Sequence, residues 1–164
     1  MSEQSRLMTS LAEQQRAAER VAARLRRSCQ ALVGVLPVTA ADVGTLPTPA
    51  EDAIDAFLKR FEQLQDLIQN GLFRTLALLE GESVAALSRR DIALLMEKLG
   101  VIDAADTWSE LALLRNMLAH EYPGRPDKQA QRLNLAYAAA TQLLAGLDRL
   151  KDYLARKRLL PPTG

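Results

Sequence analysis

The chain has 164 residues, enough for one domain that buries roughly two-thirds of its unfolded surface. Hydrophobic residues make up 48% of it but aromatic residues only 4%, so Leu, Ala and Val dominate, which favours helices packed on helices. The formal net charge of +1 excludes a surface that is basic throughout, so any contact with nucleic acid would need a local patch. We therefore expect a single all-α domain, residues 1–164, built as a helical bundle of about five helices.

The sequence carries one cysteine, Cys29, which cannot form an internal disulfide bond. The N-terminal residues are charged throughout, unlike the apolar segment of a signal peptide. No run approaches the roughly 18 apolar residues that a membrane-spanning helix needs. These features predict a soluble, cytoplasmic protein that makes no contact with a membrane.

The N-terminal segment, residues 1–33, predicts one long amphipathic helix, because apolar residues recur at helical spacing from residue 8 onward. Another face of this helix is basic. The basic stripe consists of Arg16, Arg20, Arg24 and Arg27. A solvated helix face explains such a stripe more often than a phosphate-binding surface does. Residues 34–49 contain three prolines, two glycines and no helical period, so they predict a loop.

The next predicted helix begins at a capping box formed by Thr48 and Glu51, with Pro49 as its first helical residue. It continues to about residue 81. The Asn-Gly pair at residues 70–71 favours a kink or a break in its middle, because glycine costs about 1 kcal/mol against alanine in a helix interior.

Three further helices follow from their cap residues and apolar spacing, over residues 89–99, 107–122 and 126–156. Ser88 and Asp91 form a capping box for the first of them, and Gly100 ends it. The second begins at Asp103 or Thr107 and runs to the Pro-Gly pair that follows Tyr122.

A helical wheel of residues 107–122 separates an apolar arc from a polar arc. The arc expected to face the core consists of Leu111, Leu113, Leu114, Met117 and Leu118. The opposite arc consists of Trp108, Ala112, Arg115, Asn116, Ala119 and His120, joined by Tyr122 if the helix extends that far. The alanines leave space for a substrate or a partner helix to approach. Trp108 can stack on a base there, although a packing anchor is its commoner role.

The stretch RNMLAHEYPG, residues 115–124, contains the only histidine of the chain, His120. Histidine most readily takes up and releases a proton near neutral pH, and the guanidinium of Arg115 suits a phosphate whose charge rises in the transition state. Together they can cleave RNA without a metal ion, with His120 deprotonating a 2′-hydroxyl or protonating the leaving oxygen. The sequence has no clustered metal ligands and no Gly-rich phosphate loop, so we expect neither a metal ion nor a cofactor.

A structural role explains the same residues. Positive side chains near a helix C-terminus complement the helix dipole, and Pro-Gly often ends a helix. Lys128 and Arg132 on the following helix can flank a phosphate path or simply cover a solvated face. The residue pattern alone leaves the catalytic and the structural interpretations open.

The stretch RNMLAHEY resembles the R-x4-H-x-Y motif of the HEPN superfamily, and more closely that of the HepT-like toxins. The fixed positions of the motif correspond to Arg115, His120 and Tyr122, and the residue that often follows its arginine corresponds to Asn116. The resemblance covers about residues 50–158, which we take as the motif-bearing part of the bundle.

The resemblance implies an all-α, HEPN-like bundle that pairs as a homodimer and brings two copies of the motif together. It implies a metal-independent endoribonuclease that cuts tRNA or mRNA, with Arg115 and His120 as catalytic residues and Asn116 in support. It further implies a type VII-like toxin–antitoxin system, whose nucleotidyltransferase antitoxin transfers AMP from ATP to Tyr122. An adenylyl group there would exclude the RNA substrate by its charge and bulk.

Two other hypotheses stay open. The protein can be a noncatalytic partner that binds nucleotide or substrate for a nucleotidyltransferase, or a helical interaction protein in which the motif is coincidental. Toxicity that is lost on changing His120 to Ala supports the first hypothesis, and nucleotide binding without toxicity supports the second. The absence of both toxicity and nucleotide binding supports the third.

Overall fold

The computed structural model describes residues 2–160. Its helices are α1 (Glu3–Ala31), α2 (Thr48–Asp66), α3 (Phe73–Leu79), α4 (Arg89–Leu99), α5 (Ala105–Leu118) and α6 (Pro126–Arg156). Short turns add η1 (Val43–Thr45), η2 (Leu67–Leu72) and η3 (Val84–Ala86). No strand occurs within residues 2–160, where the only β pairing is an isolated bridge between Val33 and Leu36. The predicted all-α bundle of about five helices is confirmed, since α2, η2 and α3 form one continuous helix.

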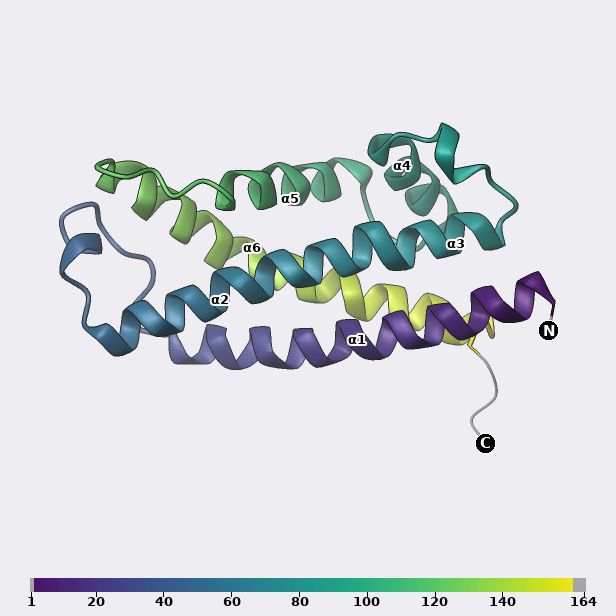
Figure 1. The fold of residues 1–164 in the computed structure, drawn as a ribbon, viewed down its shortest axis with the longest axis horizontal. Coiled ribbons are helices and arrows are strands. Elements are labelled where there is room, and N and C mark those ends of the chain that lie inside the picture. The colour runs from purple at the N-terminus through teal and green to yellow at the C-terminus, as the bar shows by residue number, and fades with distance from the viewer. Residues whose placement is uncertain (1, 161–164) are drawn as a thin grey trace.

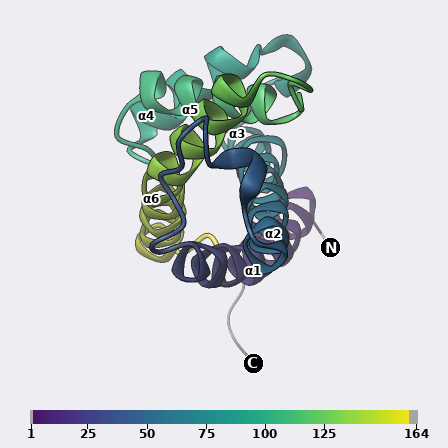
Figure 2. The same cartoon turned by 90° about the vertical axis from the view of Figure 1, so that its left-hand side faces the viewer.

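Four long helical segments lie side by side and alternate in direction along the chain (Figure 1). Viewed from one end, α1 and α5 occupy opposite sides of the bundle, with α2 and α6 between them (Figure 2). Helix α6 is the longest, with 31 residues and hence a length of about 46 Å. The short helix α4 packs against α3 and α5 at the end of the bundle where α5 begins.

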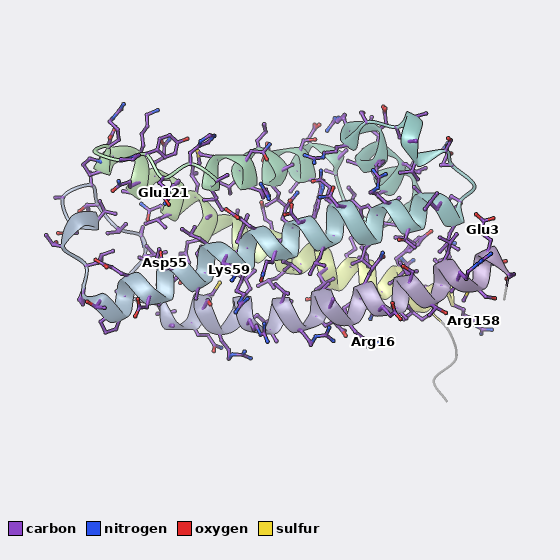
Figure 3. The ribbon with its side chains drawn as sticks, viewed as in Figure 1. Glu3, Arg16, Asp55, Lys59, Glu121 and Arg158 are labelled. Carbon is purple, nitrogen blue, oxygen red and sulfur yellow. The ribbon has the colours of Figure 1, made fainter. Side chains whose placement is uncertain are left out.

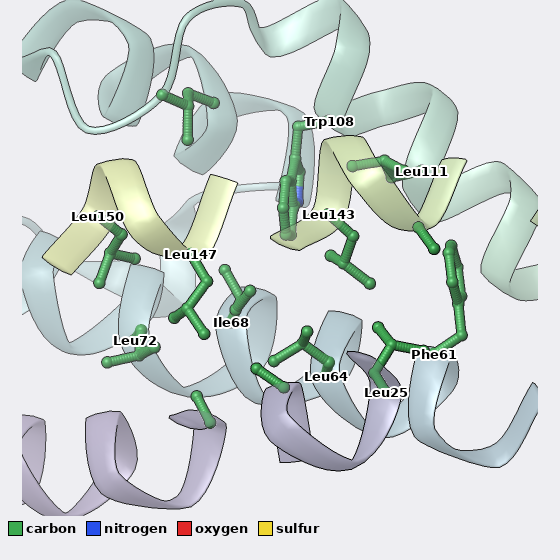
Figure 4. Packing of buried hydrophobic residues seen from close by; sticks show 14 of the residues in the cluster. Leu25, Phe61, Leu64, Ile68, Leu72, Trp108, Leu111, Leu143, Leu147 and Leu150 are labelled. Atoms are coloured by element: carbon green, nitrogen blue, oxygen red, sulfur yellow. The ribbon is translucent and has the colours of Figure 1, made fainter. Parts of the chain in front are cut away.

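The core lies between these helices and is mostly aliphatic, with a few large aromatic side chains (Figure 4). Each long helix contributes an apolar stripe at helical spacing, and members of the cluster include Leu25, Phe61, Leu64, Ile68, Leu72, Trp108, Leu111, Leu143, Leu147 and Leu150. Burying one leucine or phenylalanine side chain stabilises a fold by about 1.5–3 kcal/mol relative to leaving it exposed. Helix packing is therefore the main source of stability here.

The ends of the first two helices differ slightly from the prediction. Helix α1 spans Glu3–Ala31 where residues 1–33 were predicted, and the Ser2 hydroxyl caps its start by accepting a hydrogen bond of 3.1 Å from the Ser5 amide. The capping box predicted at Thr48 is wrong: Thr48 is already helical, Pro47 is the cap residue, and no side chain caps this end. Prolines on both sides of Thr48 restrict the backbone there without help from a side chain.

The Asn-Gly pair at residues 70–71 does not break the second helix. Instead, residues Leu67–Leu72 form a π-helical turn, in which the hydrogen bonds span one residue more than in an α-helix. The chain then continues directly into α3.

The predictions for α4 and α6 are confirmed. Ser88 and Asp91 form a reciprocal capping box with two hydrogen bonds of 3.0 Å, and Gly100 ends α4 in a left-handed conformation (φ 83°). Helix α6 has the predicted bounds, Pro126–Arg156. In both cases the information that sets the helix end lies within a few residues of that end.

The predicted loop that follows α1 closes one end of the core. Leu36 and Val38 of this loop are buried. The side-chain amide of Asn134 on α6 accepts a hydrogen bond from the Val38 amide and donates one to the Val38 carbonyl, both of 2.8 Å. The loop therefore lies against α6, at the end of the bundle where α5 runs out (Figure 1).

Candidate functional site

Helix α5 ends at Leu118, four residues before the predicted end at Tyr122. The guanidinium of Arg132 on α6 donates hydrogen bonds to the carbonyls of Leu118 and His120, which have no partner within the helix. Arg132 therefore caps α5 from a neighbouring helix instead of covering a solvated face. The predicted position of His120 on the polar arc of this helix is wrong, because His120 lies outside the helix.

The segment after α5 places Tyr122 in an unusual backbone conformation. Tyr122 has φ 51°, a left-handed value that costs a non-glycine residue roughly 1–2 kcal/mol. Its carbonyl accepts hydrogen bonds from the Gln129 side chain at 2.9 Å and from the Arg125 amide at 3.1 Å. Backbone strain of this kind concentrates at functional sites, where neighbouring groups hold it in place.

Three side chains gather around this segment, and we call them the motif cluster: His120, Tyr122 and Lys128. The rings of His120 and Tyr122 lie 6.0 Å apart, and the Lys128 ammonium lies 5.6 Å from the centre of the Tyr122 ring. His120 is exposed, and its ring makes no hydrogen bond to residues 2–160. The half-buried Tyr122 likewise has a hydroxyl without a partner in the described part of the chain. Figure 3 shows Glu121, between these two residues, at the same end of the bundle as Asp55.

Arg115 points away from the motif cluster, towards α2. Its Nε and Nη2 donate to the two carboxylate oxygens of Asp66 at 3.1 Å and 2.8 Å, so the pair is bidentate. This hydrogen bonding to Asp66 raises the pKa of Arg115 above its ordinary value. The arginine therefore stays charged and fixed in orientation, with Nη1 unused by any partner in residues 2–160.

The Arg115–Asp66 pair lines a small polar cavity of about 170 Å³, which we call the α2–α5 pocket. Its lining comes from three helices and from η2, and consists of Gln65, Asp66, Gln69, Asn70, Arg89, Ala112, Arg115 and Asn116. The predicted approach space beside Ala112 is thus present, but it opens to the arginine and not to the histidine. The structure brings Arg115 and Asn116 together and leaves His120 and Tyr122 in the separate motif cluster.

The side of α5 that faces the core differs from the helical wheel. Trp108, placed on the polar arc, is only 5% exposed and packs against Phe73 with ring centres 4.7 Å apart. Leu113, placed on the core arc, is 70% exposed. The indole lies beside Gly146 of α6. The base-stacking role considered for Trp108 is therefore wrong.

Several residues of the site were not found from the sequence. Asp66 and Arg89 belong to ordinary amphipathic patterns, so nothing in the sequence distinguished them. Gln65 and Gln69 did offer a signal, since they occur four residues apart within an apolar stripe, where glutamine is uncommon.

Within residues 2–160, no three His, Cys, Asp or Glu side chains are arranged to hold a metal ion. No helix of the described chain is both long enough and apolar enough to cross a membrane. Comparison with family models, curated proteins and solved structures finds no match.

Proposed function

We propose that the protein is a metal-independent endoribonuclease, the toxin of a HEPN-type toxin–antitoxin pair, with Arg115 and His120 as its catalytic residues. The observation that supports this most directly is the fixed orientation of Arg115 together with the accessibility of His120. Arg115 is held in one orientation by Asp66, and His120 is exposed with both ring nitrogens free of other partners. A fixed positive charge and an accessible proton carrier are what phosphoryl chemistry requires.

The proposed reaction is an internal transfer at phosphorus. The 2′-oxygen of a ribose attacks the neighbouring phosphorus, and the bond to the 5′-oxygen of the next nucleotide breaks. His120 takes the proton from the 2′-hydroxyl or supplies one to the departing 5′-oxygen, while Arg115 neutralises the charge on the phosphorane. The products are a 2′,3′-cyclic phosphate and a 5′-hydroxyl end. Asn116, beside Arg115, supplies a further polar contact to the phosphate.

The separation of Arg115 from His120 within one chain makes a homodimer part of the proposal. Leu113 and Leu135 are 70% and 45% exposed, and with Met117 they line a groove of about 410 Å³ between α5 and α6. An exposed apolar groove of this kind is a candidate protein interface. We assign it to a second copy of the chain, because the groove continues along α5 directly to the motif. A twofold contact there would bring two motifs together.

The proposed switch is adenylylation of Tyr122. Its hydroxyl oxygen attacks the α-phosphorus of ATP on a nucleotidyltransferase antitoxin, pyrophosphate leaves, and the phenolic proton passes to solvent. The free hydroxyl of Tyr122 and the nearby ammonium of Lys128 support this assignment, since the ammonium can pair with the new phosphate. The modified tyrosine would place a negative charge beside His120 and repel RNA.

The second candidate is a noncatalytic partner that binds nucleotide for a nucleotidyltransferase. The α2–α5 pocket favours it, because this pocket is polar and does not include His120. A protein of this kind would bind nucleotides but cut no RNA.

The deciding experiment is cleavage of total tRNA and of a long mRNA by the purified protein in EDTA. We expect wild type to cut and His120→Ala to lose activity by about 100-fold or more, as for a general acid–base residue. Glu121→Gln is the matched control, because it alters the neighbouring exposed residue and should cut at nearly the wild-type rate. Absence of cleavage by wild type, or equal cleavage by His120→Ala, would contradict the proposal.

A further inference from the structure

Two glutamines are buried where the fold alone calls for apolar side chains. Gln65 and Gln69 are 2% and 5% exposed, next to the fully buried Leu64 and Ile68 of the same helical face. Burying an amide is unfavourable unless its hydrogen-bonding groups find partners. A buried polar group in an apolar stripe therefore points to a role other than packing.

The two amides satisfy each other only in part. Gln65 Nε2 donates to Gln69 Oε1, while Gln65 Oε1 and Gln69 Nε2 have no partner within residues 2–160. Neither free atom is fully enclosed, and both side chains line the α2–α5 pocket. Reversing both amides would again leave one acceptor and one donor free, so this conclusion does not depend on their orientation.

The backbone is also special at this point. Gln69 lies within the π-helical turn η2, and Gln65 immediately precedes Asp66, the last residue before that turn. Turns of this type are rare and frequently occur at functional sites. Here one continuous helix presents both amides and the Asp66 carboxylate to the same pocket.

One positive charge at the pocket is uncompensated. Arg89, the first residue of α4, is exposed and makes no ion pair in the described structure. Arg115, in contrast, is paired with Asp66. The amides at the start of α4 are occupied in part by the Ser88–Asp91 capping box, so the Arg89 side chain is the group available to an anion.

We propose that the α2–α5 pocket binds one nucleotide, with the edge of its base on the free amide groups of Gln65 and Gln69 and its phosphate on Arg89. An adjacent donor and acceptor match the edge of a nucleobase, as in the pairing of Asn or Gln side chains with bases. A forked guanidinium matches a phosphate. The cavity of about 170 Å³ suits a base alone, with the sugar and phosphate at its rim. That this nucleotide belongs to an RNA strand rests on the proposed function.

The test uses the full-length His120→Ala protein, so that RNA stays intact during the measurement. It is titrated by calorimetry with AMP, GMP, CMP and UMP, and with inorganic phosphate. We expect at least one nucleotide to bind at least tenfold more tightly than phosphate. Arg89→Ala should weaken that binding by about tenfold or more. Arg16→Ala is the matched control: it removes an equal charge from α1, on the opposite side of the bundle from α5, and should change nothing (Figures 2 and 3).

The base contact is tested by replacing both glutamines with methionine. Replacing both hydrogen-bonding partners by apolar groups of similar shape is nearly neutral for stability, so the protein should remain folded, as thermal unfolding will show. We expect this variant to lose the preference among bases while still binding phosphate. Equal affinity for phosphate and nucleotides, an unchanged base preference, or no binding at all would overturn the proposal.

A single-stranded RNA oligonucleotide separates the possible sources of the nucleotide. If the oligonucleotide displaces the bound nucleotide, and Arg89→Ala weakens the binding of both to the same extent, the pocket receives RNA. If it does not compete, the RNA source is wrong. Nucleotide binding by a protein that fails to cut RNA would refute the ribonuclease proposal alone, whereas cleavage without nucleotide binding would refute the pocket alone.

Discussion

The Arg115–Asp66 pair is the best-defined polar contact of the candidate site. It joins residues 49 positions apart, and its side chains are 29% and 39% exposed. An ion pair so exposed to water contributes little to stability, at most about 1 kcal/mol. Its main effect is geometric, because two parallel hydrogen bonds fix the plane of the guanidinium.

Asp66→Asn should therefore reduce activity far more than stability. The neutral amide cannot hold the guanidinium with two charge-assisted bonds, so Arg115 would lose its orientation. We expect kcat for RNA cleavage to fall roughly 10- to 100-fold, with a change in unfolding free energy below about 1 kcal/mol. Asp106→Asn, which breaks a comparable exposed pair with Arg90, is the control and should leave kcat unchanged. Equal losses of kcat in both variants would count against a positioning role.

Trp108 is part of the core, where it packs against Phe73. Trp108→Ala should lower the unfolding free energy by about 3–5 kcal/mol, as for other large-to-small changes in a core, measured by urea denaturation. Because Trp108 is the only tryptophan, its fluorescence reports on this position alone. The emission should not change when RNA is added to His120→Ala. Quenching by RNA would show that the indole is accessible after all.

At the scale of elements, α6 makes polar contacts with the segment after α5, with the loop after α1 and with α1 itself. Its first turns fix the segment after α5 through Gln129 and Arg132, and Asn134 fixes the loop that follows α1. Farther along, the Lys151 ammonium pairs with Glu19 of α1 at 2.7 Å. The hydrogen bond from Lys151 lowers the pKa of the Glu19 carboxyl.

This contact between α1 and α6 predicts a defined pH dependence. The pKa of Glu19 is lower in the folded chain than in the unfolded chain, so the unfolded chain takes up this proton first as the pH falls. The contribution of Glu19 to the unfolding free energy is therefore fully present above its unfolded pKa, and it is lost as the pH falls through its folded pKa. Wild type should lose slightly more unfolding free energy than Glu19→Gln between about pH 5 and pH 3, by less than about 1 kcal/mol because the pair is partly exposed. Urea unfolding at several pH values measures this difference. Parallel curves for the two proteins would refute it.

At the scale of the whole molecule, the exposed groove between α5 and α6 predicts self-association. Leu113→Glu should place a charge in the groove and convert the proposed dimer into a monomer, as seen by light scattering after size exclusion. Leu78→Glu, at a leucine that is 43% exposed on α3, is the control and should leave the mass unchanged. A wild-type protein that is monomeric at all concentrations tested would contradict the homodimer.

The sequence was sufficient for the features that depend on neighbouring residues. The apolar period predicted an all-α chain, the Ser88–Asp91 capping box predicted α4, and Pro126 marked the start of α6. Each of these depends on hydrogen bonds or side-chain spacing within a few residues, which a sequence states directly. The motif residues were likewise identifiable, although their roles stay a proposal.

Only the tertiary structure decided which face of α5 is buried, where this helix ends and how Arg115 is oriented. Leucines occur around much of this helix, so the wheel could not tell that Trp108 packs inward over Gly146 while Leu113 faces outward. The end of α5 depends on Arg132 of another helix, and the orientation of Arg115 depends on Asp66. The sequence by itself determined which helices form, because helix formation is local. Packing determined which face of α5 is buried and which pocket receives Arg115, because those contacts join residues that are distant along the chain.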